Sequence, residues 1–150
     1  MERPQKEPIG LELTRTARLV SRAFDEALRA AGGSLPIWLV LLALKARHHG
    51  TQGSVAAAVG IEGPTLTHHL NRLEASGLVA RARDPQNRRV QLVDLTDEGH
   101  GMFDRLRTAV VAFDQRLRAG MAPADLAHLS ALLGRLRTNV GPEGTPGEES

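Results

Sequence analysis

The sequence predicts a mostly helical protein in which one hairpin of extended chain interrupts a series of helices. Apolar residues recur at spacings of three and four along most of the 150 residues, which is the period of an amphipathic helix. Aromatic residues make up only 3% of the chain, so apolar burial depends on Leu, Val and Ala, which pack between helices. Only residues 78–95 change to extended character, around a turn sequence.

Composition excludes several kinds of protein. The chain has no cysteine, which excludes a disulfide framework, a thiolate metal site and thiol-based redox sensing. It has no long apolar run, so we expect neither a signal peptide nor a membrane partner, and a cytoplasmic location. Residues 1–8 are polar and Pro-rich, and residues 141–150 hold mainly Gly, Pro, Glu and Ser. We therefore expect a disordered N-terminus and a disordered acidic tail.

The first two predicted helices differ in how much of their surface is apolar. Residues 9–33 end at Gly32 and Gly33 and carry a single stripe of apolar residues, which are Leu13, Ala17, Val20, Phe24, Ala27 and Ala31. The second helix begins near Ser34 and Pro36, and residues 38–44 are apolar all round. A helix of that kind is expected to be buried on most sides.

Residues 51–77 predict two short helices joined by a tight turn, which is a helix-turn-helix candidate. Thr51 is the expected N-cap of the first helix, which ends at Gly60, and the second runs from near Gly63 to Gly77. One side of the second helix is expected to be buried, through Ile61, Leu66, Leu70 and Leu73. The opposite side is polar, with His68, Asn71 and Arg72 flanked by Thr65 and Thr67.

Two extended runs follow this pair of helices. The first run begins at Leu78, the second lies around Leu92, and the turn residues between them are Asp84, Pro85, Gln86 and Asn87. A hairpin directly after the second helix of a helix-turn-helix is a wing. Residues 34–96 are therefore predicted to form a winged helix-turn-helix lobe with a two-stranded wing.

Two further helices are predicted within residues 97–140. Thr96 is the expected N-cap of the first, and the last carries an apolar stripe of Leu126, Leu129, Leu133, Leu136 and Val140. The small central lobe cannot cover these stripes together with that of residues 9–33. We therefore expect residues 9–33 and 97–140 to be the dimerisation helices of an isologous homodimer. A monomeric bundle that folds back on itself is the alternative.

A local excess of positive charge lies in the middle of the chain, although the formal net charge of the whole is only +2. Between residues 72 and 89, two acidic residues, Glu74 and Asp84, stand among Arg72, Arg81, Arg83, Arg88 and Arg89. Such an excess is typical of a surface that meets a polyanion such as nucleic acid. An ordinary solvated charged face has the same composition and is the alternative.

Six short motifs share the order and spacing of one known family. They are Leu-Pro-Ile-Trp at 35–38, Val-Gly-Ile-Glu-Gly-Pro-Thr-Leu-Thr at 59–67, Leu-Asn-Arg-Leu-Glu at 70–74, Gly-Leu-Val at 77–79, Asp-Pro-Gln-Asn-Arg-Arg at 84–89 and Leu-Thr-Asp-Glu-Gly at 95–99. On these residues the chain resembles the MarR family of bacterial regulators, although Glu62 stands where the family usually has Ser or a similar cap. The resemblance implies a triangular homodimer that straddles a pseudo-palindromic site on double-stranded DNA, and a small-molecule effector that releases the DNA.

The candidate DNA-binding residues form two groups. The recognition helix offers polar groups to base edges in the major groove, with Asn suited to adenine and Arg to guanine, through Thr65, Thr67, His68, His69, Asn71 and Arg72. The wing offers Arg81 and Arg83 to the sugar-phosphate backbone, and Arg88 and Arg89 to a narrow minor groove. Two alternatives stay open: an ion pair between Arg72 and a neighbour such as Glu74 or an acidic residue of the wing, and partial burial of His69.

Two further assignments concern the wing and an effector. By resemblance, Asp84 is expected to structure the wing by pairing with Arg88 or Arg89, while an ordinary turn Asp that bonds its own backbone is the alternative. Ser34 and Trp38 open the second helix and are candidates for binding a small aromatic or phenolic effector. An ordinary core position for Trp38 is the alternative.

Other functional classes find less support in the sequence. No hydrolase elbow, Gly-rich phosphate loop or metalloprotease motif is present, so we expect neither an enzyme nor a cofactor. We expect no metal site within one chain because adjacent His pairs diverge on a helix, which leaves only assembly across a dimer for His48, His49, His68, His69, His100 and His128. The prediction is a sequence-specific transcriptional repressor, and the alternative is a non-sensing architectural or protein-binding winged-helix module.

Overall fold

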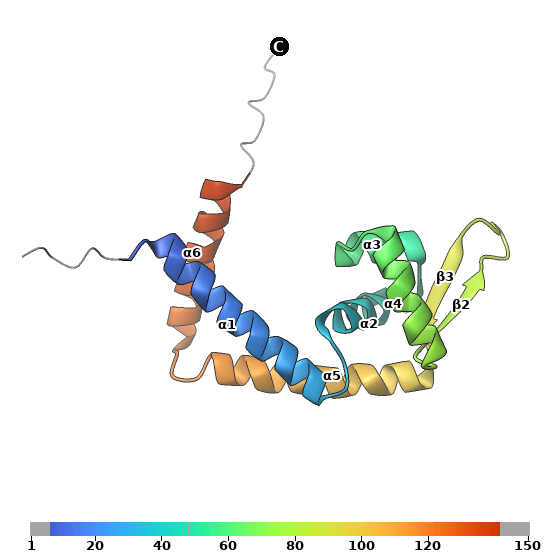
Figure 1. Ribbon diagram of the computed structural model, residues 1–150, viewed down its shortest axis with the longest axis horizontal. Helices are drawn as coiled ribbons and strands as arrows, with labels where there is room; N and C mark the ends of the chain where they lie inside the picture. Colours follow the sequence, from blue (N-terminus) through green and yellow to red (C-terminus); the bar gives the residue numbers. More distant parts are fainter. Residues whose placement is uncertain (1–6, 48, 142–150) are drawn as a thin grey trace, which may run out of the picture. The chain divides into compact units, whose positions relative to one another are not determined.

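The computed structural model describes residues 7–47 and 49–141 (Figure 1). In chain order the elements are α1 (Ile9–Ala30), α2 (Leu35–Arg47), β1 (His49–Thr51), α3 (Gln52–Val59), α4 (Gly63–Ala75), β2 (Val79–Arg83), β3 (Gln91–Leu95), α5 (Asp97–Leu117) and α6 (Pro123–Val140). The predicted fold class, mostly helical with a winged helix-turn-helix, is confirmed. The chain divides into two compact units, and the division falls after Phe113, within α5.

The core of the first unit is built around α2. Val40, Leu41 and Leu44 have no exposed surface, because α2 contacts α1, α3, α4, β1 and β3. The prediction that this helix is buried on most sides is confirmed, with Leu42 as an exception at 41% exposed. Most of the remaining core residues come from α4, the sheet and α5, and they include Leu66, Leu70, Val93, Phe103 and Leu106, while α1 and α3 contribute Leu28 and Val55.

The helix-turn-helix consists of α3 and α4, and local hydrogen bonds explain its ends. The Thr51 hydroxyl accepts a hydrogen bond from the Ser54 amide at 3.0 Å, as expected of an N-cap. Gly60 ends α3 with a φ of +70°, a left-handed conformation that favours glycine. At the start of α4, Glu62 makes no side-chain cap hydrogen bond, so Pro64 in the first turn carries the signal for helix initiation.

A three-stranded antiparallel sheet follows the order β1-β3-β2. β2 and β3 pair from Val79 opposite Leu95 to Arg83 opposite Gln91, and they extend away from the helices as a hairpin (Figure 1). The predicted hairpin is therefore confirmed. β1 is a finding that the sequence did not predict: it lies on the other side of β3, with Gly50 opposite Val93.

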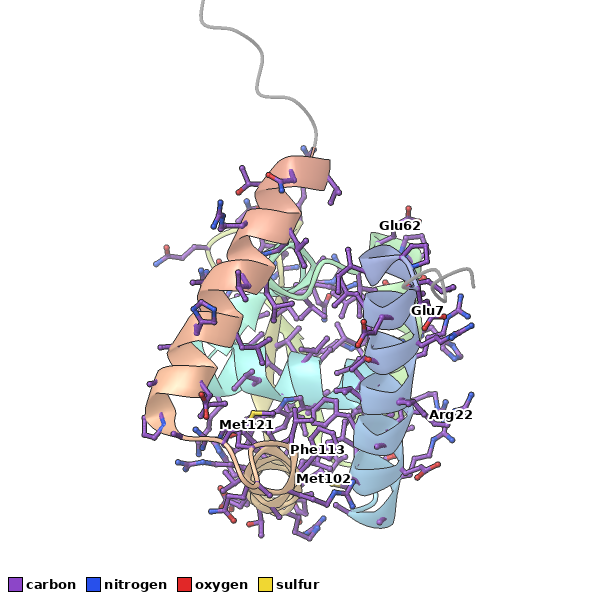
Figure 2. All side chains as sticks on the ribbon, turned by 90° about the vertical axis from the view of Figure 1, so that its left-hand side faces the viewer. Glu7, Arg22, Glu62, Met102, Phe113 and Met121 are labelled. Carbon is purple, nitrogen blue, oxygen red and sulfur yellow. The ribbon has the colours of Figure 1, made fainter. Side chains whose placement is uncertain are left out.

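α1 contacts the rest of the first unit mainly through its C-terminal half. Leu28 is fully buried, and the Phe24 ring lies 5.1 Å from the Phe113 ring of α5. Arg22 extends from the side of α1 that faces away from Phe113 (Figure 2). The N-terminal half exposes large apolar side chains, and 67% of Leu19 and 66% of Ile9 are accessible.

α6 belongs to the second unit, and none of its side chains is buried. Leu129, Leu132 and Val140 are among its exposed apolar residues. The disorder expected of the chain ends mostly concerns residues 1–6 and 142–150, which lie outside the described residues. No single helix in the described part of the chain is long and apolar enough to cross a membrane. The pair α1 and α2 meets the length and composition criteria only when the two are taken together, and it is bent by 72° at the junction.

Candidate nucleic-acid interface

α4 separates an apolar face from a polar one. Leu66, Leu70 and Leu73 are buried in the core, while the side formed by Thr65, His68, Asn71 and Arg72 is exposed. His69 is half-buried, in agreement with the alternative of partial burial given above. Four of the six candidate residues on this helix are therefore accessible to a partner.

Thr67 is held by hydrogen bonds within the helix-turn-helix. Its hydroxyl donates to the Gly63 carbonyl at 2.9 Å and accepts from the Gln52 side-chain amide at 2.8 Å. Gln52 lies in the first turn of α3, so this hydrogen bond links α3 to α4. The sequence did not identify Gln52, because nothing in the spacing of residues 52 and 67 indicates a contact.

Arg81 joins the wing to the recognition helix. Its Nε donates to a carboxylate oxygen of Glu74, and its Nη2 donates to Oδ1 of Asn71 at 2.5 Å. Only 18% of the Arg81 side chain is exposed, compared with 43% for Glu74. The ion pair considered for Arg72 and Glu74 is therefore replaced by one between Arg81 and Glu74.

The turn of the wing is organised by its own side chains. Oδ1 of Asp84 accepts from the Gln86 amide at 2.9 Å, and Oδ1 of Asn87 accepts from the Arg89 amide at 3.2 Å. This bonding of Asp84 is that of a turn residue, and no ion pair to Arg88 or Arg89 accompanies it within residues 7–47 and 49–141. Both arginines are exposed at the tip.

Arg83 lies at the end of β2, where the turn begins. Its Nη1 donates to the Arg88 carbonyl at 2.9 Å. This bond spans the two sides of the hairpin next to the tip, so Arg83 supports the wing while its side chain remains exposed.

A groove of about 500 Å³ separates the start of the helix-turn-helix from the wing. Its lining is mostly apolar, and Arg89 and Gln91 come from the wing side while Gln52 and Gly63 come from the first turns of α3 and α4. The full lining is Thr51, Gln52, Gly53, Ala56, Gly63, Leu66, Arg89, Val90 and Gln91. The groove therefore has wing residues on one side and residues of the helix-turn-helix on the other.

Ser34 and Trp38, the candidate effector residues, lie at the start of α2. The Ser34 hydroxyl accepts from the Ile37 amide at 3.4 Å. Trp38 is only 8% exposed and stacks on Phe103, with ring centroids 5.2 Å apart and an interplanar angle of 16°. Lys45 covers the Phe103 ring from 5.4 Å. Trp38 thus occupies a core position, as its alternative interpretation allowed.

The histidines do not form a metal centre among the described residues. No group of three His, Cys, Asp or Glu side chains suited to a metal ion occurs in that part of the chain. Nδ1 of His100 lies 3.0 Å from the Lys45 ammonium, and the rings of His68 and His69 are 5.9 Å apart and tilted. His48 lies outside the described residues.

Comparison with known proteins places this arrangement among DNA-binding regulators. A family model described as MarR family matches residues 34–90. The chain is similar to the uncharacterised HTH-type transcriptional regulator YwoH of Bacillus subtilis, with 29% identity over 121 residues that make up 81% of this chain and 88% of YwoH.

Two solved structures have the same fold over nearly their whole length. One is the transcriptional repressor CouR bound to a 23-mer DNA duplex, with 27% identity, a TM-score of 0.77, and coverage of 87% of this chain and 92% of CouR. The other is the PcaV transcriptional regulator of Streptomyces coelicolor in complex with its natural ligand, with 26% identity, a TM-score of 0.74, and coverage of 91% and 99%.

Proposed function

We propose that the chain is a repressor of the MarR family, whose model matches residues 34–90, and that it binds a pseudo-palindromic operator as a homodimer and leaves it when a small effector binds. Members of this family are DNA-binding regulators and not enzymes. Residues 34–96 are the DNA-binding lobe in this proposal, and residues 9–33 and 97–140 supply the dimer interface.

The observation that carries the proposal is the pairing of an exposed polar helix face with an exposed basic hairpin tip, separated by a groove. α4 suits the major groove, where each base pair presents a distinct pattern of donors and acceptors. Arg88 and Arg89 suit the adjacent minor groove, where a narrow groove concentrates negative potential. In this arrangement the sugar-phosphate backbone that separates the major from the minor groove of DNA passes through the protein groove lined by Arg89 and Gln52.

Within this proposal the candidate residues have different tasks. Thr65, His68 and Arg72 are exposed on α4 and contact base edges. Thr67 already uses its hydroxyl hydrogen within the protein, so it has only acceptor capacity left for DNA, and His69 packs at the edge of the contact. Arg83 lies near the phosphates.

A homodimer is supported by the apolar surface that one chain leaves uncovered. Ile9, Leu11, Leu13 and Leu19 of α1 and several residues of α6 are exposed, although burying a Leu side chain stabilises a protein by about 1.5 to 3 kcal/mol. A second copy would cover these residues. The expected result is a dimer at micromolar concentration in analytical ultracentrifugation, and a monomer there would contradict this part of the proposal.

An effector is supported by the ligand-bound state of the similar PcaV structure. Ser34 and Trp38 lie where α1 passes into α2, so a ligand there would contact both the predicted dimer helices and the DNA-binding lobe. Trp38 is the only tryptophan in the chain, so its fluorescence reports such binding directly. We expect a small aromatic acid to change this fluorescence and release DNA over the same concentration range, and release without the fluorescence change would exclude this location.

The test of the main proposal is fluorescence anisotropy with the DNA upstream of the protein's own gene and with a scrambled duplex, at two salt concentrations. A regulator is expected to bind its operator about 10³-fold or more tighter than scrambled DNA, with two protomers per site. Where the upstream DNA contains no operator, selection from random duplexes supplies one. Equal affinity for all duplexes after selection would instead support an architectural winged-helix module.

A further inference from the structure

The contact between Arg81 and Asn71 determines which atoms of Asn71 remain available. A guanidinium carries only hydrogen-bond donors, so the amide must present its oxygen to Arg81. Oδ1 is the acceptor in this contact, at 2.5 Å from Nη2. Because the amide is planar, its NH₂ group lies on the side away from Arg81, and Asn71 itself is exposed on α4.

Arg81 is fixed in this position by a second contact. The same guanidinium donates from Nε to Glu74, which lies three residues after Asn71 and therefore on the same side of the helix. Arg81 is also one of the less exposed arginines of this surface, at 18% for the side chain. A guanidinium held by two partners in this way is oriented toward α4, which makes it a poor contact for a DNA phosphate.

This arrangement changes what Asn71 can recognise. An asparagine that reads adenine uses both ends of its amide, accepting from N6 and donating to N7. Here the accepting end is engaged by a charged donor, and hydrogen bonds to charged groups are roughly twice as strong as neutral ones. The contact with Arg81 occupies one of the two lone pairs of Oδ1 and leaves both N–H groups unaffected, and these match the acceptors O6 and N7 of guanine or O4 of thymine.

We propose that Arg81 is a positioning residue that makes Asn71 mainly a hydrogen-bond donor, so that the recognition helix prefers guanine or thymine over adenine at the base facing Asn71. This inference rests on the proposed function, because it assumes that α4 enters the major groove. It replaces two expectations from the sequence: that Asn71 pairs with adenine, and that Arg81 contacts the DNA backbone.

The experiment compares operators selected from random duplexes by the full-length wild-type protein and by four variants. Asn71→Ala identifies the base that Asn71 reads, as the position where preference is lost. Wild type is expected to prefer guanine or thymine there by about three- to tenfold, the effect of one hydrogen bond. Arg81→Met frees the amide oxygen and is expected to move the preference at that position toward adenine.

Two controls separate this effect from loss of charge. Arg83→Met removes a cation from the same strand without touching Asn71, so it is expected to weaken binding to all duplexes alike and to leave the selected sequence unchanged. Glu74→Gln removes the ion pair but keeps the bond between Arg81 and Asn71, so the preference is expected to stay that of wild type.

Three results would overturn the inference while leaving the proposed function intact: adenine selected by wild type at that position, an unchanged preference in Arg81→Met, or weaker binding of Asn71→Ala with no change in preference. If Arg81→Met does not fold, Asn71→Asp replaces it, since it keeps an oxygen for Arg81 and removes the NH₂ donor. That variant is expected to lose the guanine or thymine preference. Failure to select any site would overturn the proposed function and the inference together.

Discussion

Gly99 in the first turn of α5 offers a sharp test of how the wing is attached to the rest of the first unit. A Cβ at this position would lie 2.0 Å from the Leu78 carbonyl oxygen and 3.2 Å from a methyl group of Leu95. The carbonyl cannot swing aside as a side chain can, because it also accepts from the Thr96 amide at 3.2 Å. Gly99→Ala therefore forces the start of α5 away from the segment that leads into β2.

The expected cost follows from two opposing effects. Overpacking of this kind costs about 1 to 3 kcal/mol, and a clash with backbone belongs at the upper end of that range. Alanine in place of glycine within a helix stabilises the folded state by about 1 kcal/mol. The free energy of unfolding of Gly99→Ala is therefore expected to fall by about 2 kcal/mol, which for a chain of this length lowers Tm by roughly 4 to 8 °C.

Gly101 supplies the matched control in the same helix. A Cβ there would meet only the Arg105 guanidinium at 3.7 Å, an ordinary contact with a flexible side chain. The free energy of unfolding of Gly101→Ala is expected to rise by up to about 1 kcal/mol, because alanine has a higher helix propensity than glycine. Urea unfolding of wild type and both variants, at one fixed protein concentration because a dimer's stability depends on it, measures the difference. Equal stability of the two variants would refute the reasoning.

Three further predictions follow from the core and the wing. Leu44→Ala empties a fully buried position in α2 and is expected to cost about 3 to 5 kcal/mol in urea unfolding; a loss below 1 kcal/mol would mean that α2 is not central to the core. Arg89→Ala is expected to weaken operator binding and to reduce the slope of log K against log salt by about 0.9 for each wing, and an unchanged slope in anisotropy titrations would remove Arg89 from the interface. Asp84→Asn keeps an oxygen for the Gln86 amide and is expected to bind DNA at least as tightly as wild type, whereas Asp84→Ala binds more weakly; equal loss in both would indicate an ion pair instead of the turn.

Local patterns predicted much of this fold because their physical causes are local. The N-cap at Thr51 and the left-handed turn at Gly60 depend on residues within one helical turn. The apolar character of residues 38–44 was sufficient to predict burial, since no orientation of that helix leaves all of it in water. The hairpin followed from the turn residues after Asp84.

What the sequence did not predict depends on pairing across long separations. β1 is three residues long, shows no alternation of its own, and exists only because β3 lies beside it. The contacts of Arg81 with Glu74 and Asn71 join a strand to a helix, where no fixed spacing applies. Counting charges placed Arg81 in the correct region, but only geometry shows that its guanidinium is already bonded within the protein.

β1 has a consequence for how the protein would select its operator. The segment entering α3 is hydrogen-bonded to β3, and β3 carries one side of the wing, so α3 and the wing cannot hinge apart without breaking backbone pairing. The hydrogen bond between Gln52 and Thr67 in turn joins the recognition helix α4 to α3. Each lobe is then expected to bind DNA as one rigid body. The proposed homodimer would therefore select operators by the distance between the two half-sites, normally one helical turn of 10 to 10.5 base pairs or a multiple of it. One base pair inserted at the centre of the operator would be expected to abolish binding with both half-sites intact. If the proposed effector exists, we expect it to act by changing the distance between the two DNA-binding lobes, and not by changing the structure of either lobe.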